Sequence, residues 1–303
     1  MTINIEQLNE QLKGVMPFAP TPFSMTDQEV DLAGFKKNLT LLVDHKVDSI
    51  GVCGFAGEFA AISLEEYGQL MKAAVEVAGG KALIMAGVGH GTKTAIAYAR
   101  VAQEQGADCI MILPPYVSDA PADGLYNHNK AIAKSVEIGV MLHSMPGGAN
   151  LTPEVIARLS ELDNVVAYKD ELRDINRFHE IRWQTGEDIA YVSANGEKLI
   201  EYYFLYGNVG LATAMGNFDP GVIMTLYRCL EDRDHSSVKK ILQEKIIPWY
   251  TLRERDRGML ISVTKESMNM LGLCGGVPRL PLMPVGEKER KELAELMNYL
   301  GYA

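Results

Sequence analysis

One lysine of this sequence directly follows a strongly apolar run. Lys169 comes after Val165-Val166-Ala167-Tyr168, a segment typical of a strand that is buried on both faces. Lysine is rarely buried unless it is paired or functional. Desolvation would lower the pKa of the amine towards the range in which it attacks a ketone to form an imine. Alternatively, the strand has already ended and Lys169 pairs with Asp170 in solvent, and the local sequence leaves both possibilities open.

A turn bounded by glycines follows another apolar run and consists of Gly54, Phe55, Ala56 and Gly57. Glycine allows a tight turn and a close approach between backbone and ligand. Exposed amides in such a turn can hold a carboxylate without any charged side chain. An ordinary connection between a strand and a helix fits the same residues. We treat all four as candidate substrate-binding residues.

Polar and aromatic side chains end several other runs. His143 could carry protons near neutral pH, although a hydrogen-bonded structural histidine fits this position equally well. Tyr116 follows two prolines and is either a ligand-facing hydroxyl or an interface aromatic. The remaining substrate-binding candidates are Ser144, Ser193 and Asn217.

The sequence gives little indication of a metal site. Its six histidines lack the spacing of zinc ligands, and its four cysteines include no Cys-x-x-Cys pair. Buried free thiols in a reducing compartment are the simplest interpretation. Because a protonated lysine imine is itself an electron sink, we expect neither a metal nor an organic cofactor.

The elements that must position these residues alternate along the chain. Short apolar runs rich in Val, Ile and Ala are followed by longer segments of helical periodicity. Eight such units fit a closed barrel or an open doubly wound sheet. No run leads into a Gly-x-Gly-x-x-Gly loop, so we predict an α/β fold of the (β/α)8 TIM-barrel type. The eight runs are Val15–Pro20, Ser49–Gly54, Leu83–Val88, Asp108–Leu113, Gly139–His143, Val165–Lys169, Ile189–Ala194 and Val209–Met215.

The chain beyond the eighth run is predicted to be helical. We assign residues 1–218 to the barrel core, and residues 219–303 to the last barrel helix and a C-terminal helical extension. Helical periodicity covers Gly221–Leu230, Ser236–Arg253, Leu260–Leu271 and Glu287–Leu300. Within the barrel, Ser63 and Glu66 form a capping-box pattern before the helix Leu64–Ala78, and Thr152-Pro153 starts another helix.

Charge and hydropathy exclude two classes of partner. The formal net charge of −10, with no long basic run, argues against nucleic acid, which requires clustered Lys and Arg. No apolar stretch approaches the roughly 20 residues that span a bilayer. The N-terminal residues lack an apolar signal core. We therefore expect a cytoplasmic protein that acts on a small molecule.

Taken in order, several motifs resemble the dihydrodipicolinate synthase and N-acetylneuraminate lyase family of Schiff-base barrels. The resemblance covers nearly the whole chain and implies Lys169 as the imine-forming residue. It is carried by the first-strand motif 17–23, the Gly54-x-x-Gly57-Glu58 turn, Ala86-Gly87-Val88-Gly89, Gly106-Ala107-Asp108, Leu113-Pro114-Pro115-Tyr116 and Tyr168-Lys169-Asp170.

Within the family, the chain is most similar to the 5-dehydro-4-deoxyglucarate dehydratase branch. That resemblance rests on Gly57-Glu58-Phe59, Gly91-Thr92 to Ala99-Arg100, Leu113 to Val117 with Ala120-Pro121, Asn217-Phe218-x-Pro220, and Gly275 to Pro281. It implies a homotetramer built from dimers. It also implies loss of water and carbon dioxide from a sugar diacid derivative to give 2,5-dioxopentanoate.

The sequence departs from the family pattern at three places. His143-Ser144 stand where the family has a tyrosine that acts as acid and base, and Phe55 and Ala56 stand where threonine is usual. The region of the synthase arginine reads Pro146-Gly147-Gly148, so dihydrodipicolinate synthesis or another pyruvate-dependent aldol reaction is the weaker assignment. One account is a modified enzyme in which His143 carries the proton and Phe55 narrows the pocket or favours a less polar substrate. The other is a catalytically weak regulatory protein that binds a keto acid.

The cost of a buried lysine favours the enzyme over the regulatory protein. We therefore expect a Schiff-base lyase, either an aldolase or a dehydratase, that acts on a 2-keto acid through Lys169 and His143.

Overall fold

Eight parallel strands form a barrel in the structure, a computed structural model that describes residues 5–115, 120–194, 197–207 and 209–302. The hydrogen-bonded order is β1-β8-β7-β6-β5-β4-β3-β2. A bridge between Phe18 and Gly51, with a 2.8 Å bond from the Ala19 N–H to the Gly51 carbonyl, joins β1 to β2. The predicted barrel is thus confirmed. Its strands are β1 Val15–Pro17, β2 Ser49–Val52, β3 Leu83–Val88, β4 Cys109–Ile112, β5 Gly139–Ser144, β6 Val165–Asp170, β7 Ala190–Ala194 and β8 Gly210–Thr213.

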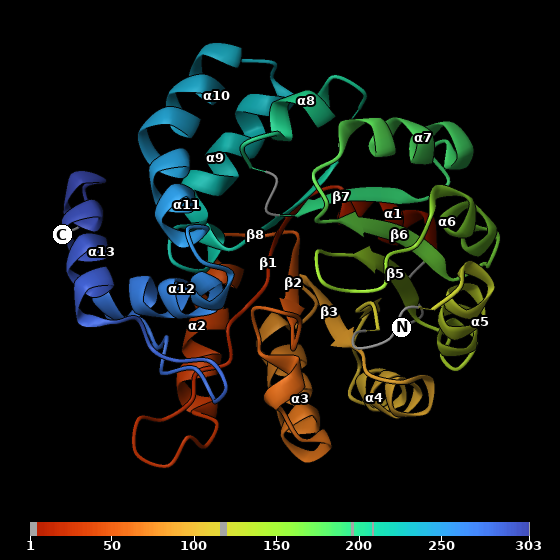
Figure 1. Cartoon of the computed structure of the whole chain (residues 1–303), viewed down its shortest axis with the longest axis horizontal. Coiled ribbons are helices and arrows are strands. Elements are labelled where there is room, and N and C mark those ends of the chain that lie inside the picture. Colours follow the sequence, from red (N-terminus) through yellow and green to blue (C-terminus); the bar gives the residue numbers. More distant parts are fainter. Residues whose placement is uncertain (1–4, 116–119, 195–196, 208, 303) are drawn as a thin grey trace.

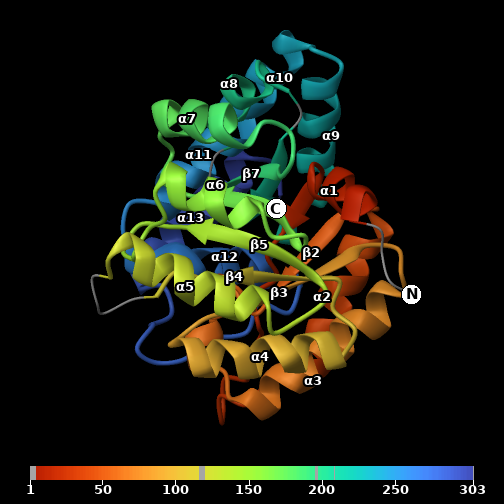
Figure 2. The same cartoon turned by 90° about the vertical axis from the view of Figure 1, so that its right-hand side faces the viewer.

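A helix follows each strand and covers the outside of the barrel (Figures 1 and 2). A further helix, α1 Ile5–Leu12, precedes β1. This arrangement buries the strands on both faces, which explains their apolar composition. The covering helices are α2 Leu32–Asp44, α3 Leu64–Ala78, α4 Thr92–Glu104, α5 Ala122–Ala133, α6 Pro153–Ser160, α7 Ile175–Thr185, α8 Ile200–Phe204 and α9 Pro220–Glu231.

Two helix starts follow the predicted capping chemistry. The Ser63 hydroxyl accepts a bond from the Glu66 N–H, and the Glu66 carboxylate accepts one from the Ser63 N–H. Thr152 caps α6, with Pro153 in its first turn. These bonds satisfy amides that have no partner inside the helix.

The C-terminal helices gather beside α2 and α9 (Figure 1). They are α10 His235–Ile241, α11 Ile247–Arg253, α12 Leu260–Met270 and α13 Glu287–Tyr299. A π-helical turn, Leu242–Ile246, interrupts the continuous helix predicted for 236–253. Pro248 explains the interruption, because it has no N–H to bond to the carbonyl four residues earlier.

The segment after α12 folds back onto the start of the barrel. Phe23 forms a bridge to Val277, and the Asn38 side chain bonds both the carbonyl and the N–H of Cys274. The C-terminal region therefore contacts the end of the barrel that carries the loops after β1 and β2. None of the helices in the described part of the chain is both long and apolar enough to cross a membrane.

Candidate active site

Lys169 lies inside the barrel near the carboxyl end of β6, with only 5% of its surface exposed. Its neighbour Asp170 belongs to the opposite face of the strand, since successive side chains alternate. Asp170 accepts bonds from the Leu172 N–H at 2.7 Å and the Tyr191 hydroxyl at 3.1 Å. The alternative of a solvent-exposed Lys169–Asp170 pair is therefore wrong.

His143 lies directly opposite Lys169 in the β5–β6 register and is 1% exposed. Its Nδ1 is 3.1 Å from the Lys169 carbonyl oxygen. A carbonyl can only accept, so Nδ1 carries the hydrogen and the Nε2 lone pair of the neutral ring faces the Lys169 Nζ at 3.3 Å. Burial, together with the charge of Lys169, holds the pKa of His143 well below its usual range. The ring is therefore neutral, and its Nε2 lone pair is directed at the lysine nitrogen.

Glu171 completes this group and was missed by the sequence analysis. It is 9% exposed, and its Oε2 lies 3.7 Å from the Lys169 Nζ and 3.6 Å from the His143 Nε2. Its N–H donates to the Ser144 carbonyl at 3.0 Å, which continues the strand pairing beyond Asp170. Residues two apart share a strand face, so Glu171 faces inwards with Lys169. The alternation of side chains along β6 was therefore the signal from which the sequence could have identified Glu171.

Burial controls the charge of the lysine. Desolvation lowers the pKa of Lys169 below its ordinary value, and the neighbouring Glu171 carboxylate opposes part of that effect. Lys169 also lies 5.0 Å from the centre of the Phe18 ring. The result is a buried amine beside one neutral base and one carboxylate, a set that can form an imine and move protons around it.

A small cavity of about 40 Å³ surrounds the Lys169 and Glu171 side chains. Phe55 and Ala56 of the predicted turn line it. Among the described residues, neither the Phe55 nor the Ala56 N–H donates a hydrogen bond. These amides are available to an anion, as the turn chemistry requires. We call this space the inner cavity; its other lining residues are Phe18, Met111, Ala194, Ala212, Thr213, Ala214 and Arg253.

The turn itself has an unusual backbone. Cys53 and Glu58, at its two ends, have positive φ angles of 51° and 57°, a region that non-glycine residues rarely occupy. The Thr21 hydroxyl donates to the Gly57 carbonyl at 2.8 Å. A Cβ at Gly57 would lie 3.0 Å from the Cys53 backbone, so glycine allows the turn to close. Gly54 and Gly57 thus shape the turn and do not line the inner cavity.

Three of the other sequence candidates, Ser144, Ser193 and Asn217, are not among the residues that line the inner cavity. Ser144 and Ser193 are paired with Asp170 in the sheet and lie on the strand face opposite to His143 and Lys169. Asn217 is buried and donates to the Phe18 and Ala214 carbonyls, each at 3.0 Å. Its amide therefore ties β1 to the end of β8. Tyr116 lies outside the described residues.

The C-terminal region contributes two further buried cations. Arg253 of α11 lines the inner cavity, while its Nε donates to the Leu260 carbonyl at 3.0 Å and the Thr264 hydroxyl at 3.1 Å. Lys265 of α12 pairs with Glu58, with 2.5 Å between Nζ and Oε1, and donates to the Val277 carbonyl at 2.8 Å. Burial lowers the pKa of Lys265 to about 8. The ion pair between Lys265 and Glu58 connects the glycine turn to the C-terminal region.

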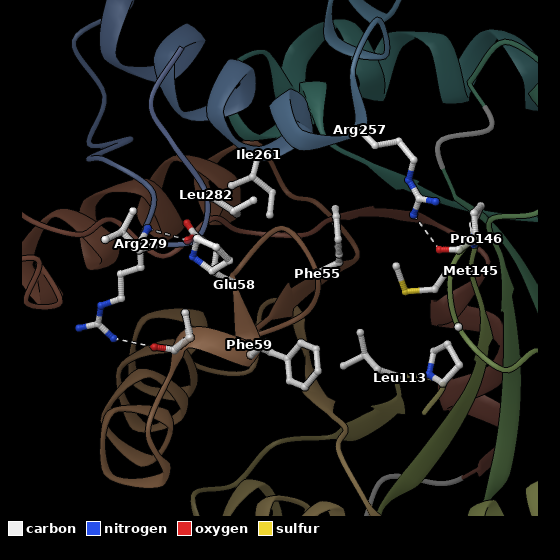
Figure 3. A pocket seen from close by; sticks show the side chains of 17 residues that line it. Phe55, Glu58, Phe59, Leu113, Met145, Pro146, Arg257, Ile261, Arg279 and Leu282 are labelled. Carbon is white, nitrogen blue, oxygen red and sulfur yellow. Dashed lines mark hydrogen bonds between the residues drawn. The ribbon is translucent and has the colours of Figure 1, made fainter. Parts of the chain in front are cut away.

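A larger pocket of about 420 Å³ opens beyond Phe55, which lines both spaces. Figure 3 shows Phe55 between Leu282 on one side and Met145 on the other, with Phe59 and Leu113 nearby. We call this space the outer pocket. It lies between the loops after β2, β4 and β5 and the C-terminal segments around Arg257, Ile261 and Leu280. No cluster of His, Cys, Asp and Glu within the described ranges could hold a metal ion.

An eight-stranded α/β barrel with reactive groups grouped at the carboxyl ends of its strands has the architecture of a barrel enzyme. Comparison with known proteins defines it further. Residues 11–300 match the model of the dihydrodipicolinate synthetase family. The chain belongs to that family and is a lyase, as its motifs predicted.

Curated relatives cover nearly the whole chain. A probable 5-dehydro-4-deoxyglucarate dehydratase from Bradyrhizobium sp. (strain BTAi1) is 32% identical, over 95% of this chain and 92% of the relative. A protein of the same description from Pseudomonas putida (strain F1) is 31% identical, over 96% of this chain and 98% of the relative.

Solved structures agree on the fold. Dihydrodipicolinate synthase from Oceanobacillus iheyensis superposes with a TM-score of 0.93 at 26% identity, over 99% of this chain and all of that chain. The synthase from Bacillus clausii gives a TM-score of 0.91 at 28% identity, over 96% of this chain and 98% of that chain.

Proposed function

We propose that the protein forms a Schiff base between Lys169 and the C2 ketone of a 2-keto acid, and then eliminates water or cleaves a C–C bond. The observation that carries the proposal is the buried triangle of Lys169, His143 and Glu171, with separations of 3.3, 3.6 and 3.7 Å. Family membership and the dehydratase names of the relatives support the reaction class. 5-Dehydro-4-deoxyglucarate is the substrate that those names suggest.

Imine formation starts with the neutral amine of Lys169. Desolvation favours that form, and the His143 Nε2 lone pair is in position to accept a proton from Nζ. Attack on C2 gives a carbinolamine, and His143 returns the proton to its hydroxyl group, which leaves as water; the products are a protonated imine and a neutral His143. The negative charge of Glu171 stabilises this cation, as it stabilises the free ammonium.

A base then removes a proton from C3, and the electrons of the broken C–H bond flow into the iminium. His143 is the proposed base, because its neutral Nε2 faces the reacting nitrogen. The imidazolium that results would be buried, and the Glu171 carboxylate 3.6 Å away would offset part of its desolvation. Glu171 is therefore assigned to the catalytic group together with Lys169 and His143.

The substrate carboxylate is proposed to bind the free amides of Phe55 and Ala56. Both residues line the inner cavity with Lys169, and backbone amides in a turn form an anion site. Arg253, which also lines this space, adds positive charge. Since the lysine imine is the electron sink, the proposed reaction requires no metal or organic cofactor.

The working state is proposed to be a cytoplasmic homotetramer made of two dimers. Exposed apolar side chains on α7 and in and after α8, namely Trp183, Tyr202, Leu205 and Tyr206, support association through that face. Sedimentation velocity should then show a species of about four 33.3 kDa chains.

Reduction by borohydride in the presence of pyruvate tests the central proposal. We expect a mass increase that peptide mapping assigns to Lys169 and that Lys169→Met abolishes. Lys265, the second buried lysine with a lowered pKa, is an internal control, because its Nζ is bound to Glu58 and Val277. An adduct on Lys265, or no adduct with any 2-keto acid, would refute the proposal and favour a binding protein.

A further inference from the structure

The outer pocket differs chemically from the inner cavity. Its wall is formed mainly by apolar side chains from five separate parts of the chain, including Phe55, Phe59, Leu113, Met145, Ile261 and Leu282 (Figure 3). Its volume of about 420 Å³ falls within the range of small-molecule sites. Such a surface favours ligand groups that gain from leaving water.

The charged groups in this wall already have protein partners. Glu58 pairs with Lys265 and accepts a bond from the Arg279 N–H at 2.8 Å. The Arg279 guanidinium binds the Glu66 carboxylate through two nitrogens. Arg257 donates to the Pro146 carbonyl at 2.7 Å. A chain carrying several hydroxyl groups would give up bonds to water here and compete for groups that are already paired.

Phe55 connects this pocket to the reacting lysine. The inner cavity, at about 40 Å³, is on the scale of a single water molecule. The first three carbons of a keto acid bound to Lys169 would lie beside half-buried Phe55, the residue that the inner cavity shares with the outer pocket. The rest of a substrate attached to Lys169 would then extend past Phe55 into the apolar pocket.

We infer that the substrate is a 2-keto acid whose chain beyond C4 is apolar, such as an aryl group. The inference rests on the proposed imine at Lys169 and specifies what that site accepts. The polar residues of the inner cavity bind the carboxylate and ketone, while the outer pocket binds the apolar chain. The substrate class thus differs from the sugar diacid in the names of the relatives.

Borohydride trapping with three keto acids tests this assignment. The half-saturating concentration for 2-oxo-4-phenylbutanoate should be about tenfold or more below that for pyruvate, since burial of the ring adds apolar contact. 5-Dehydro-4-deoxyglucarate should bind no better than pyruvate. A lower half-saturating concentration for the sugar acid, or equal values for the phenyl compound and pyruvate, would overturn the inference.

A matched pair of methionine variants tests whether the apolar chain of the substrate binds in the outer pocket. Met145→Gln places a polar group of similar size in the outer pocket, so it should weaken binding of the phenyl compound several-fold more than binding of pyruvate. Met283→Gln alters a side chain that is 63% exposed and outside the pocket lining. It should change the half-saturating concentration of neither compound. If Met145→Gln affects both compounds equally, the apolar chain does not bind there. Absence of any Lys169 adduct, even with pyruvate, would instead reject the proposed function.

Discussion

Glu171→Gln should separate imine formation from the later proton transfer. The substitution keeps the shape of the side chain and removes its charge. Because the Glu171 carboxylate raises the pKa of Lys169 against the effect of burial, its loss should lower that pKa further. More of the amine is then neutral at pH 7, so attack on a ketone should be as fast as in the wild type or faster.

The size of the effect follows from the geometry. Two unit charges 3.7 Å apart interact by about 4 kcal/mol at an effective dielectric constant of about 20. The interaction of Glu171 with a protonated His143, over 3.6 Å, is similar. Loss of about 2.7 kcal/mol of this interaction from the transition state should slow proton transfer by about 10²-fold, within the range of single acid–base groups.

Both steps can be followed with pyruvate. Borohydride trapping measures the imine, and exchange of the methyl protons in D2O, observed by NMR, measures proton transfer at C3. In Glu171→Gln, trapping at pH 7 should persist while exchange falls by about two orders of magnitude. His143→Phe should also slow exchange. Wild-type exchange in Glu171→Gln, or loss of trapping and exchange together, would refute the assigned role of Glu171.

Two further predictions concern residues that support the site. Asn217→Ala should lower the free energy of unfolding by about 1–3 kcal/mol in urea titrations, because the Phe18 and Ala214 carbonyls each lose the bond from the Asn217 side chain. Altered half-saturation for pyruvate without a stability loss would instead indicate substrate binding. Lys265→Met should cost about 3–5 kcal/mol by leaving buried Glu58 without its cation, and adding Glu58→Gln should restore part of it. Since the pKa of Lys265 is about 8 in the fold, below its ordinary value of 10.5, the folded protein loses this proton at a lower pH than the unfolded chain. Its contribution to stability should therefore rise between about pH 8 and 10.5, so a stability difference between wild type and Lys265→Met that stays constant there would contradict the lowered pKa.

The sequence by itself determined the barrel and singled out Lys169 as a buried lysine at the end of a strand. Apolar runs must be buried, and only a few folds bury eight such strands that alternate with amphipathic helices. The helix from Leu64 to Ala78 matched residue for residue, because its cap and its periodicity are both local. Lys169 was identifiable because a charge at the end of a buried strand contradicts its surroundings.

Strand phase could have shown that two candidates, Ser144 and Ser193, lie on the strand face opposite to Lys169. Ser144 follows His143, so if one faces inwards the other must face outwards. The same rule places Glu171 beside Lys169 once β6 is known to continue to Asp170. The sequence places strand ends only to within a few residues. An error of one residue in the phase of a strand exchanges the side chains that face into the barrel with those that face out.

Only the tertiary structure decided the chemistry around the lysine. The tautomer of His143 depends on a carbonyl from the neighbouring strand, and the function of Asn217 as a tie depends on a carbonyl 199 positions away in sequence. The outer pocket joins the loops after β2, β4 and β5 with two C-terminal segments, and Lys265 of the C-terminal region pairs with Glu58 in the loop after β2. Helix periodicity and capping depend on residues a few positions apart, whereas a buried polar group finds its partner wherever the folded chain brings one within about 3 Å.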